Sequence, residues 1–270
     1  MNVIEQFICG KKNDPALCED IIVTTPDFMA VIDGATSKSC PPLGGMTSGR
    51  FAAQTVADGL QNLPADIEGL AAMRRLSHVL REAVTPYMNV VAGTESPSCC
   101  LAVYSRARRE IWRVGDIAVM LDGQLRLLPK SIDAVTADAR AAMIEALLRS
   151  GETVESLLRD DKGRAFIFPL LARQHLFANR ADAGDFGFGV MNGAEIPEKF
   201  IDIIDANAVR EIVLASDGYP VLHPALAQSE AALAKVLRDD PLLFRLHKST
   251  KGMQAGQVSF DDRSYLRFTA

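Results

Sequence analysis

Short apolar runs separated by turns predict a protein rich in β-strands. The runs at 20–24 and 28–32 are joined by Thr25-Pro26-Asp27, a sequence typical of a tight turn. Further runs that we expect to form strands lie at 98–104, 110–114, 117–121, 124–128, 200–204, 211–216 and 263–268. Asp122-Gly123 stands between two of them and predicts a two-residue hairpin.

Apolar residues at three- and four-residue spacing predict helices between these strands. We expect Thr47 or Ser48 to cap a helix that has Phe51, Val56 and Leu60 on one face. Other helical patterns cover 67–88, 134–149, 152–159 and 229–237. Four glycines between 181 and 193 predict a mobile loop there.

The composition is that of an ordinary globular protein, with 48% hydrophobic and 23% charged residues in a chain of 270. No linker or repeat divides the chain, so we expect one domain over residues 1–270. The net charge of −5 argues against binding to nucleic acid or to a membrane surface. We expect neither a signal peptide nor a membrane span. Five scattered cysteines without zinc-ligand spacing predict reduced thiols in a cytoplasmic protein.

Four pairs of residues with carboxylates at strand ends give the strongest chemical signal. They are Glu19-Asp20, Asp33-Gly34, Asp217-Gly218 and Asp261-Asp262. A carboxylate at the mouth of a buried strand is costly unless it is paired or holds a cation. Taken singly, each pair is more typical of a turn or a solvated strand end. Taken together, they indicate oxygen ligands for magnesium or manganese, which requires the two ends of the chain to meet.

The order and spacing of these motifs resemble those of the metal-dependent protein phosphatases of type 2C, over nearly the whole chain. The matching segments are Glu19-Asp20, Val31-Ile32-Asp33-Gly34, Val114-Gly115-Asp116, Leu214-Ala215-Ser216-Asp217-Gly218 and Ser259-Phe260-Asp261-Asp262. The resemblance implies an α+β fold, a four-layer αββα sandwich in which two antiparallel sheets pack face to face with helices outside. The predicted order of strands and helices is compatible with that architecture.

The resemblance also implies a site with two manganese or magnesium ions that share a bridging water. Asp33 would bridge both ions, the carbonyl group of Gly34 would bind one, and Asp217 and Asp261 would complete the second. Glu19 and Asp20 would contact the ions directly or through water. The ions would activate the shared water for in-line attack on a phosphoester, so Asp33, Asp217 and Asp261 are the expected catalytic residues.

A third, looser ion is implied at Asp116, a residue equally typical of a turn. The partner aspartate expected four residues after Asp217 is absent, because Val221 stands there. The family's histidine after the first Asp-Gly pair is replaced by Ala35. These departures leave the third ion and the source of the leaving-group proton open.

The family's phosphate-binding arginine, four residues before the glutamate, is replaced by Pro15. Lys11, Lys12 and Arg50 are therefore candidates for phosphate binding, because a dianion near the metals requires a cation. Lys251-Gly252 is another candidate. Each of these side chains is also explained as an ordinary surface charge.

The function that the resemblance implies is that of a cytoplasmic serine/threonine protein phosphatase of compact bacterial type. Its partner would be a phosphorylated protein. Ala35 and Pro15 keep open an alternative, a sensor or scaffold with this fold and little turnover. A metal-dependent hydrolase of small phosphoesters is the third possibility.

Overall fold

The computed structural model describes residues 1–270, which form two five-stranded antiparallel sheets. The first, called here the β3 sheet, has the order β2 (Ile21–Thr24), β3 (Phe28–Gly34), β4 (Cys99–Ser105), β5 (Glu110–Val114) and β8 (Asp202–Asp205). The second, the β10 sheet, has the order β1 (Asn2–Cys9), β10 (Arg263–Thr269), β9 (Glu211–Ala215), β6 (Ala118–Leu121) and β7 (Gln124–Arg126).

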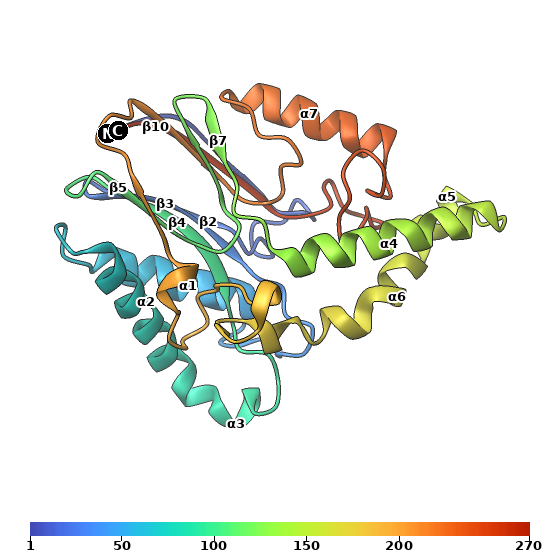
Figure 1. Ribbon diagram of the computed structural model, residues 1–270, viewed down its shortest axis with the longest axis horizontal. Coiled ribbons are helices and arrows are strands. Elements are labelled where there is room, and N and C mark those ends of the chain that lie inside the picture. The colour runs from blue at the N-terminus through green and yellow to red at the C-terminus, as the bar shows by residue number, and fades with distance from the viewer.

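The two sheets pack face to face, as Figure 1 shows. Alternate side chains of β3 and β4, such as Val31 and Tyr104, meet Leu214 and Phe268 of the other sheet in one buried cluster. The rings of Tyr104 and Phe268 lie 5.5 Å apart. Because side chains alternate along a strand, the opposite faces remain available for helices.

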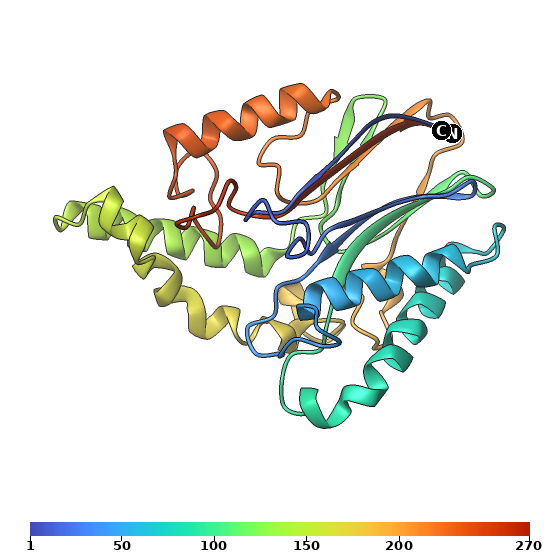
Figure 2. The same cartoon turned by 180° about the vertical axis from the view of Figure 1, so that it is seen from behind.

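Helices cover both outer faces (Figures 1 and 2). The helices α1 (Ser48–Gln61) and α2 (Gly69–Val84) pack on the β3 sheet, where Leu76 and Trp112 are fully buried. On the other side, α7 (Leu226–Asp239) lies over the β10 sheet. The expected four-layer αββα sandwich is therefore confirmed.

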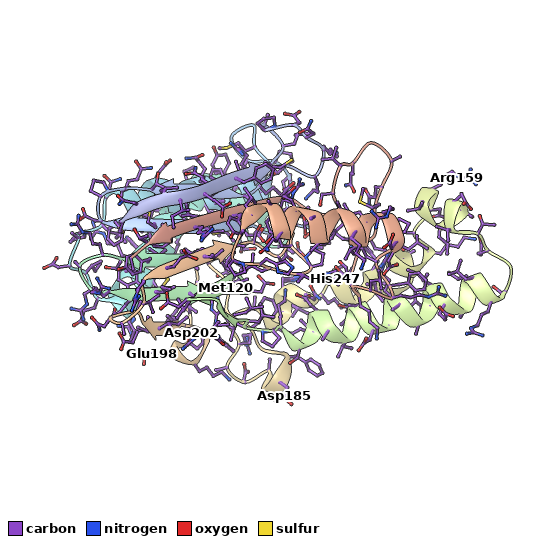
Figure 3. All side chains as sticks on the ribbon, turned by 90° about the horizontal axis from the view of Figure 1, so that it is seen from above. Met120, Arg159, Asp185, Glu198, Asp202 and His247 are labelled. Carbon is purple, nitrogen blue, oxygen red and sulfur yellow. The ribbon has the colours of Figure 1, made fainter.

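A helical arm extends beyond the sheets and consists of α4 (Ser131–Arg149), α5 (Val154–Arg159) and α6 (Lys162–Leu171). Figure 3 shows Arg159 of α5 at the far end of this arm. The shorter elements are η1 (Thr85–Tyr87), α3 (Met88–Val91), η2 (Gln174–Phe177), η3 (Gly184–Phe186) and η4 (Glu198–Phe200). No helix has both the length and the apolar character that crossing a bilayer requires.

Most predicted elements are present, including the cap of α1, where the Thr47 side chain accepts a hydrogen bond from the Arg50 N–H. Asp122 and Gly123 both have positive φ and connect β6 to β7 as a hairpin. The prediction of one helix over 67–88 was wrong in detail, because α2 ends at Val84 and is followed by η1 and α3. Neither β1 nor α6 was predicted.

The strand β1 brings the two ends of the chain together. It pairs with β10 from Asn2 opposite Thr269 to Cys9 opposite Arg263, and the chain ends lie side by side in Figure 1. The segment after β1 leads to Glu19 and Asp20, while Asp261 and Asp262 immediately precede β10. This pairing therefore carries both terminal carboxylate motifs to one end of the sandwich.

Candidate metal centre

Four of the predicted carboxylates line one cavity of about 540 Å³, together with Gly34. Asp33 is the second-to-last residue of β3. Asp116 follows the end of β5 by two residues, and Asp217 follows the end of β9 by two residues. Asp261 precedes β10 by two residues. The structure thus brings together side chains that are more than 200 residues apart in sequence.

Gly34 allows β3 to approach the start of α1 closely. A Cβ atom at this position would lie 2.5 Å from the carbonyl oxygen of Gly49 and 2.7 Å from that of Glu19. The Gly34 N–H also donates a hydrogen bond of 3.2 Å to the Glu19 carbonyl. Any side chain at residue 34 would therefore push apart the segments that form the site.

No protein group donates a hydrogen bond to the carboxylate of Asp33 or of Asp217. Burial, together with the charges of Asp20 and Asp217, raises the pKa of Asp33 well above its ordinary value. Asp217 is accessible from the cavity, yet the protein around it and the nearby Asp261 raise its pKa in the same direction. Such carboxylates lack compensation for their charge.

Asp20 is 1% exposed, and its two oxygens differ. Oδ2 accepts hydrogen bonds from the Ser216 hydroxyl at 2.6 Å and the Ser264 hydroxyl at 2.8 Å. Oδ1 is buried without a partner. Burial raises the pKa of Asp20 to about 7, although the two serine hydrogen bonds act in the opposite direction. Neither serine was predicted to belong to the site; Ser216 directly precedes Asp217, and Ser264 follows Asp262 by two residues.

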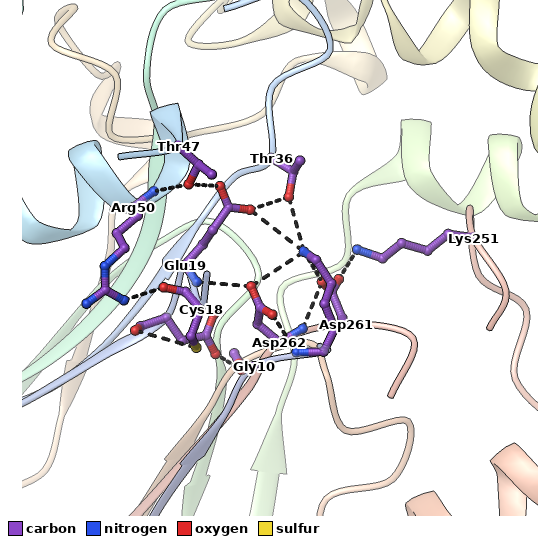
Figure 4. A network of polar contacts seen from close by, with 12 residues as sticks. Gly10, Cys18, Glu19, Thr36, Thr47, Arg50, Lys251, Asp261 and Asp262 are labelled. Atoms are coloured by element: carbon purple, nitrogen blue, oxygen red, sulfur yellow. Dashed lines mark hydrogen bonds and ion pairs between the residues drawn. The ribbon is translucent and has the colours of Figure 1, made fainter. Parts of the chain in front are cut away.

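Asp261 differs from the other carboxylates because two ammonium groups contact it. Lys11 Nζ lies 3.4 Å from Oδ1, and Lys251 Nζ contacts Oδ2 (Figure 4). Burial opposes ionisation of Asp261, but Lys251 and Lys11 outweigh it and hold the pKa below its usual value. This carboxylate is therefore ionised and paired within the protein.

Glu19 and Asp262 connect the segments behind the cavity. Both are 3% exposed. The oxygens of Glu19 accept hydrogen bonds from Thr36 and, at 2.6 Å, from Thr47. Asp262 accepts the backbone N–H of Lys11 at 2.7 Å and that of Glu19 at 3.0 Å. Threonine donors for Glu19 were not predicted, because nothing local in the sequence links residues 36 and 47 to residue 19.

The three predicted phosphate ligands have different surroundings. Lys11 lines the cavity, whereas Lys12 and Arg50 are not among its lining residues. The Arg50 guanidinium donates to the carbonyl groups of Pro15, at 3.3 Å, and Cys18, which gives it a structural role. Lys251 lines the cavity, as do Lys130 and Arg164, which sequence reasoning did not single out.

The donor set fits a hard divalent cation. Of the carboxylates of Asp20, Asp33, Asp217 and Asp261, only that of Asp261 forms ion pairs, with Lys11 and Lys251, and one buried oxygen of Asp20 has no partner. Oxygen ligands with excess negative charge suit magnesium or manganese. As the side chains stand, no three acidic, histidine or cysteine groups are close enough to form a metal site. Two effects favour this separation: the carboxylates repel one another, and Asp261 is held by its ion pairs with the lysines.

Asp116 lines both the main cavity and an adjoining cavity of about 340 Å³. Burial lowers the pKa of the neighbouring Lys130, but the charges of Asp133 and Asp116 prevail and raise it. Lys130 Nζ contacts Asp133 at 2.8 Å and lies 4.4 Å from the centre of the Phe188 ring. The positive charge of Lys130 therefore interacts with the carboxylate of Asp116.

All five cysteines are free, as expected. Burial raises the pKa of Cys18 to about 12 and also raises those of Cys99 and Cys100. These groups remain thiols at neutral pH. Since the nucleophile of a cysteine phosphatase is a thiolate, none of the three is suited to that role.

No protein-family model matches the sequence, and no curated protein matches it. Solved structures do resemble it. The serine/threonine phosphatase PstP/Ppp of Mycobacterium tuberculosis is 14% identical, with a TM-score of 0.48 and coverage of 97% of this chain and 96% of that one. The catalytic domain of PstP in complex with two manganese ions is 16% identical, with a TM-score of 0.49 and full coverage of both chains. Stp1 of Staphylococcus aureus is 14% identical, with a TM-score of 0.48 and coverage of 100% and 95%. Each of these three solved structures is that of a serine/threonine phosphatase.

Proposed function

We propose that this protein is a metal-dependent phosphatase that hydrolyses phosphoserine or phosphothreonine in proteins. The observation that carries the proposal is the convergence of Asp33, Asp217 and Asp261 on one cavity, where Asp33 and Asp217 form no ion pair and only Asp261 is paired with lysine side chains. The position of Gly34 beside them, at a close approach that excludes any side chain, supports the same site.

In this proposal Asp33, Asp217, Asp261 and the Gly34 carbonyl group hold two manganese or magnesium ions. Asp20 binds the hydroxyl groups of Ser216 and Ser264, and Glu19 binds those of Thr36 and Thr47, so both would position the segments that carry these ligands. When bound, the ions supply a hydroxide near neutral pH and offset the charge of the phosphoryl oxygens. We assign no third ion, because Val221 replaces the expected aspartate and Lys130 acts on Asp116.

The protein itself contributes cations to the phosphoryl group. Lys11, Lys251 and Arg164 line the cavity that holds the carboxylates, so a phosphate bound there would meet positive charge from several sides. Ala35 lines the same cavity and carries no proton donor.

The shape of the region favours a large substrate over a small one. The adjoining cavity shares Thr36, Lys38, Asp116 and Lys130 with the main one. The two together extend well past the space that a phosphate group requires. The additional cavity would accommodate residues that flank a phosphorylated side chain.

The test compares hydrolysis of a phosphopeptide and a small aryl phosphate with and without manganese. Wild-type protein should show metal-dependent release, and Asp33→Asn and Asp217→Asn should each lower kcat/KM by about a hundredfold or more, since each removes a charge at the reacting centre. The control is Asp66→Asn, an exposed aspartate before α2, which should retain activity.

Absence of metal-dependent release in the wild type would refute the enzyme proposal. Manganese binding by calorimetry without turnover would favour the sensor or scaffold. Preferential hydrolysis of nucleotides or sugar phosphates over phosphopeptides would favour a hydrolase of small phosphoesters.

A further inference from the structure

The two lysines at Asp261 are held in different ways. Lys11 Nζ lies 3.4 Å from Asp261, 3.4 Å from Asp262 and 3.8 Å from Glu19, and its backbone N–H is bound by Asp262. Lys251 Nζ contacts Asp261 and no other acidic group. In Figure 4 its extended side chain reaches Asp261 from the side away from Glu19. Lys11 is thus part of a network, whereas Lys251 is held by a single ion pair.

The backbone that carries Lys251 is anchored, which leaves its side chain as the movable part. Arg140 of α4, fully buried, donates hydrogen bonds to the carbonyl groups of Leu243 at 3.1 Å and Ser249 at 3.0 Å. A Cβ atom at Gly252 would lie 2.8 Å from the Arg140 guanidinium, so the chain passes close against it. The Lys251 side chain itself is 24% exposed and borders the cavity.

The ammonium group of Lys251 occupies an oxygen that a metal at Asp261 would use. Asp33 and Asp217 line the same cavity and form no ion pair, so a divalent ion that draws the side chains together would interact with three carboxylates. Lys251 pairs with only one of them. Competition at Asp261 therefore favours the metal, and the displaced ammonium group remains beside the cavity because its backbone is anchored.

We propose that Lys251 is an exchangeable counter-ion, which neutralises Asp261 before the metal binds and then binds the phosphoryl oxygens of the substrate. This inference rests on the proposed function and names the cation that replaces the missing arginine at Pro15. The two lysines then have different roles: Lys251 is exchanged, whereas Lys11 holds the network together whether or not a metal is bound.

The first test measures manganese binding to the metal-free protein by calorimetry, without substrate. Lys251→Met removes the competing charge and should tighten binding about tenfold, since a neighbouring opposite charge stabilises a carboxylate by about that factor or more. The matched control is Lys248→Met, because Lys248 lies in the same segment and borders the same cavity but pairs with the exposed Asp138 at 2.7 Å and with none of the three carboxylates. It should bind manganese as the wild type does. Equal affinity in Lys251→Met and wild type would overturn the exchange.

The second test measures binding of inorganic phosphate to the manganese-loaded proteins. Lys251→Met should weaken phosphate binding about tenfold, because a charge-assisted contact is lost, and Lys251→Arg should restore most of it. Unchanged phosphate affinity in Lys251→Met would overturn the phosphate role. If wild type and both variants fail to bind manganese, the proposed function fails as well. If all bind it equally and hydrolyse phosphopeptide equally, only the inference about Lys251 fails.

Discussion

Replacing Asp262 tests whether the two ends of the chain are held together as the structure shows. Each carboxylate oxygen of Asp262 accepts a hydrogen bond from one backbone N–H group: Oδ1 from Lys11 and Oδ2 from Glu19. A hydrogen bond to a charged group contributes about 1.5–3 kcal/mol, and loss of the acceptor leaves a buried donor unsatisfied. Asp262→Ala should therefore lower the free energy of unfolding by about 4 kcal/mol, two such bonds taken together.

The asparagine variant gives the sharper result. An amide has one oxygen, so Asp262→Asn can satisfy one of the two N–H groups and must turn its own NH₂ toward the other. We expect a loss of about 2–3 kcal/mol. If Asp262 acted only through its 3.4 Å contact with the Lys11 ammonium group, Asp262→Asn would cost as much as Asp262→Ala, because both variants remove the charge.

The assay is urea unfolding at pH 7 with a chelator present, so that metal binding does not contribute. With a slope of about 3 kcal/mol per molar urea, the alanine variant should shift the midpoint by about 1.3 M. Asp66→Asn, an exposed control, should leave the midpoint unchanged. A shift below about 0.3 M for Asp262→Ala would refute the reasoning, since that corresponds to about 1 kcal/mol.

Two further predictions concern packing and pH. Gly49→Ala should cost about 2 kcal/mol or more in urea unfolding, because its Cβ would lie 2.7 Å from Glu19 Oε1 and 2.8 Å from the Ala35 carbonyl oxygen. In the same helix Gly59→Ala would meet only side-chain atoms, at 3.2 Å, and an equal loss in both variants would contradict this prediction. Burial lowers the pKa of His247, although Asp240 acts in the opposite direction. The folded state therefore favours the neutral ring, and stability should fall as pH decreases below about 6.5. His247→Asn should reduce that fall, and identical pH profiles for variant and wild type would count against it.

Local signals in the sequence were sufficient for much of the fold. Thr47 caps α1, and Asp122-Gly123 forms a hairpin, because both depend on residues within a few positions of each other. The carboxylates of the candidate site were also identified, since Asp33 and Asp217 each stand at the end of a buried run. Their convergence was predicted from their joint pattern and from the family resemblance, and not from any one motif.

Non-local contacts account for what was missed. The strand β1 exposes Val3, Ile4 and Ile8, so its pattern lacks a buried face, and it is defined by its pairing with β10. The helix α6 contains Pro169, a residue that is unfavourable inside a helix, but only Leu170 and Leu171 of the helix follow it. Lys251 lies in an irregular segment between α7 and β10, where no periodicity predicts its contact with Asp261.

The pairing of β1 with β10 also has a consequence for synthesis of the protein. Their partners are separated by more than 250 residues, which makes closure of the β10 sheet a slow, long-range step in folding. The β3 sheet and α1 lie mainly in the first half of the chain and are available to pack early. Asp261 reaches the cavity only after β10 has left the ribosome and paired with β1. A nascent chain would therefore hold a folded half of the sandwich but no complete set of carboxylates until β10 is in place.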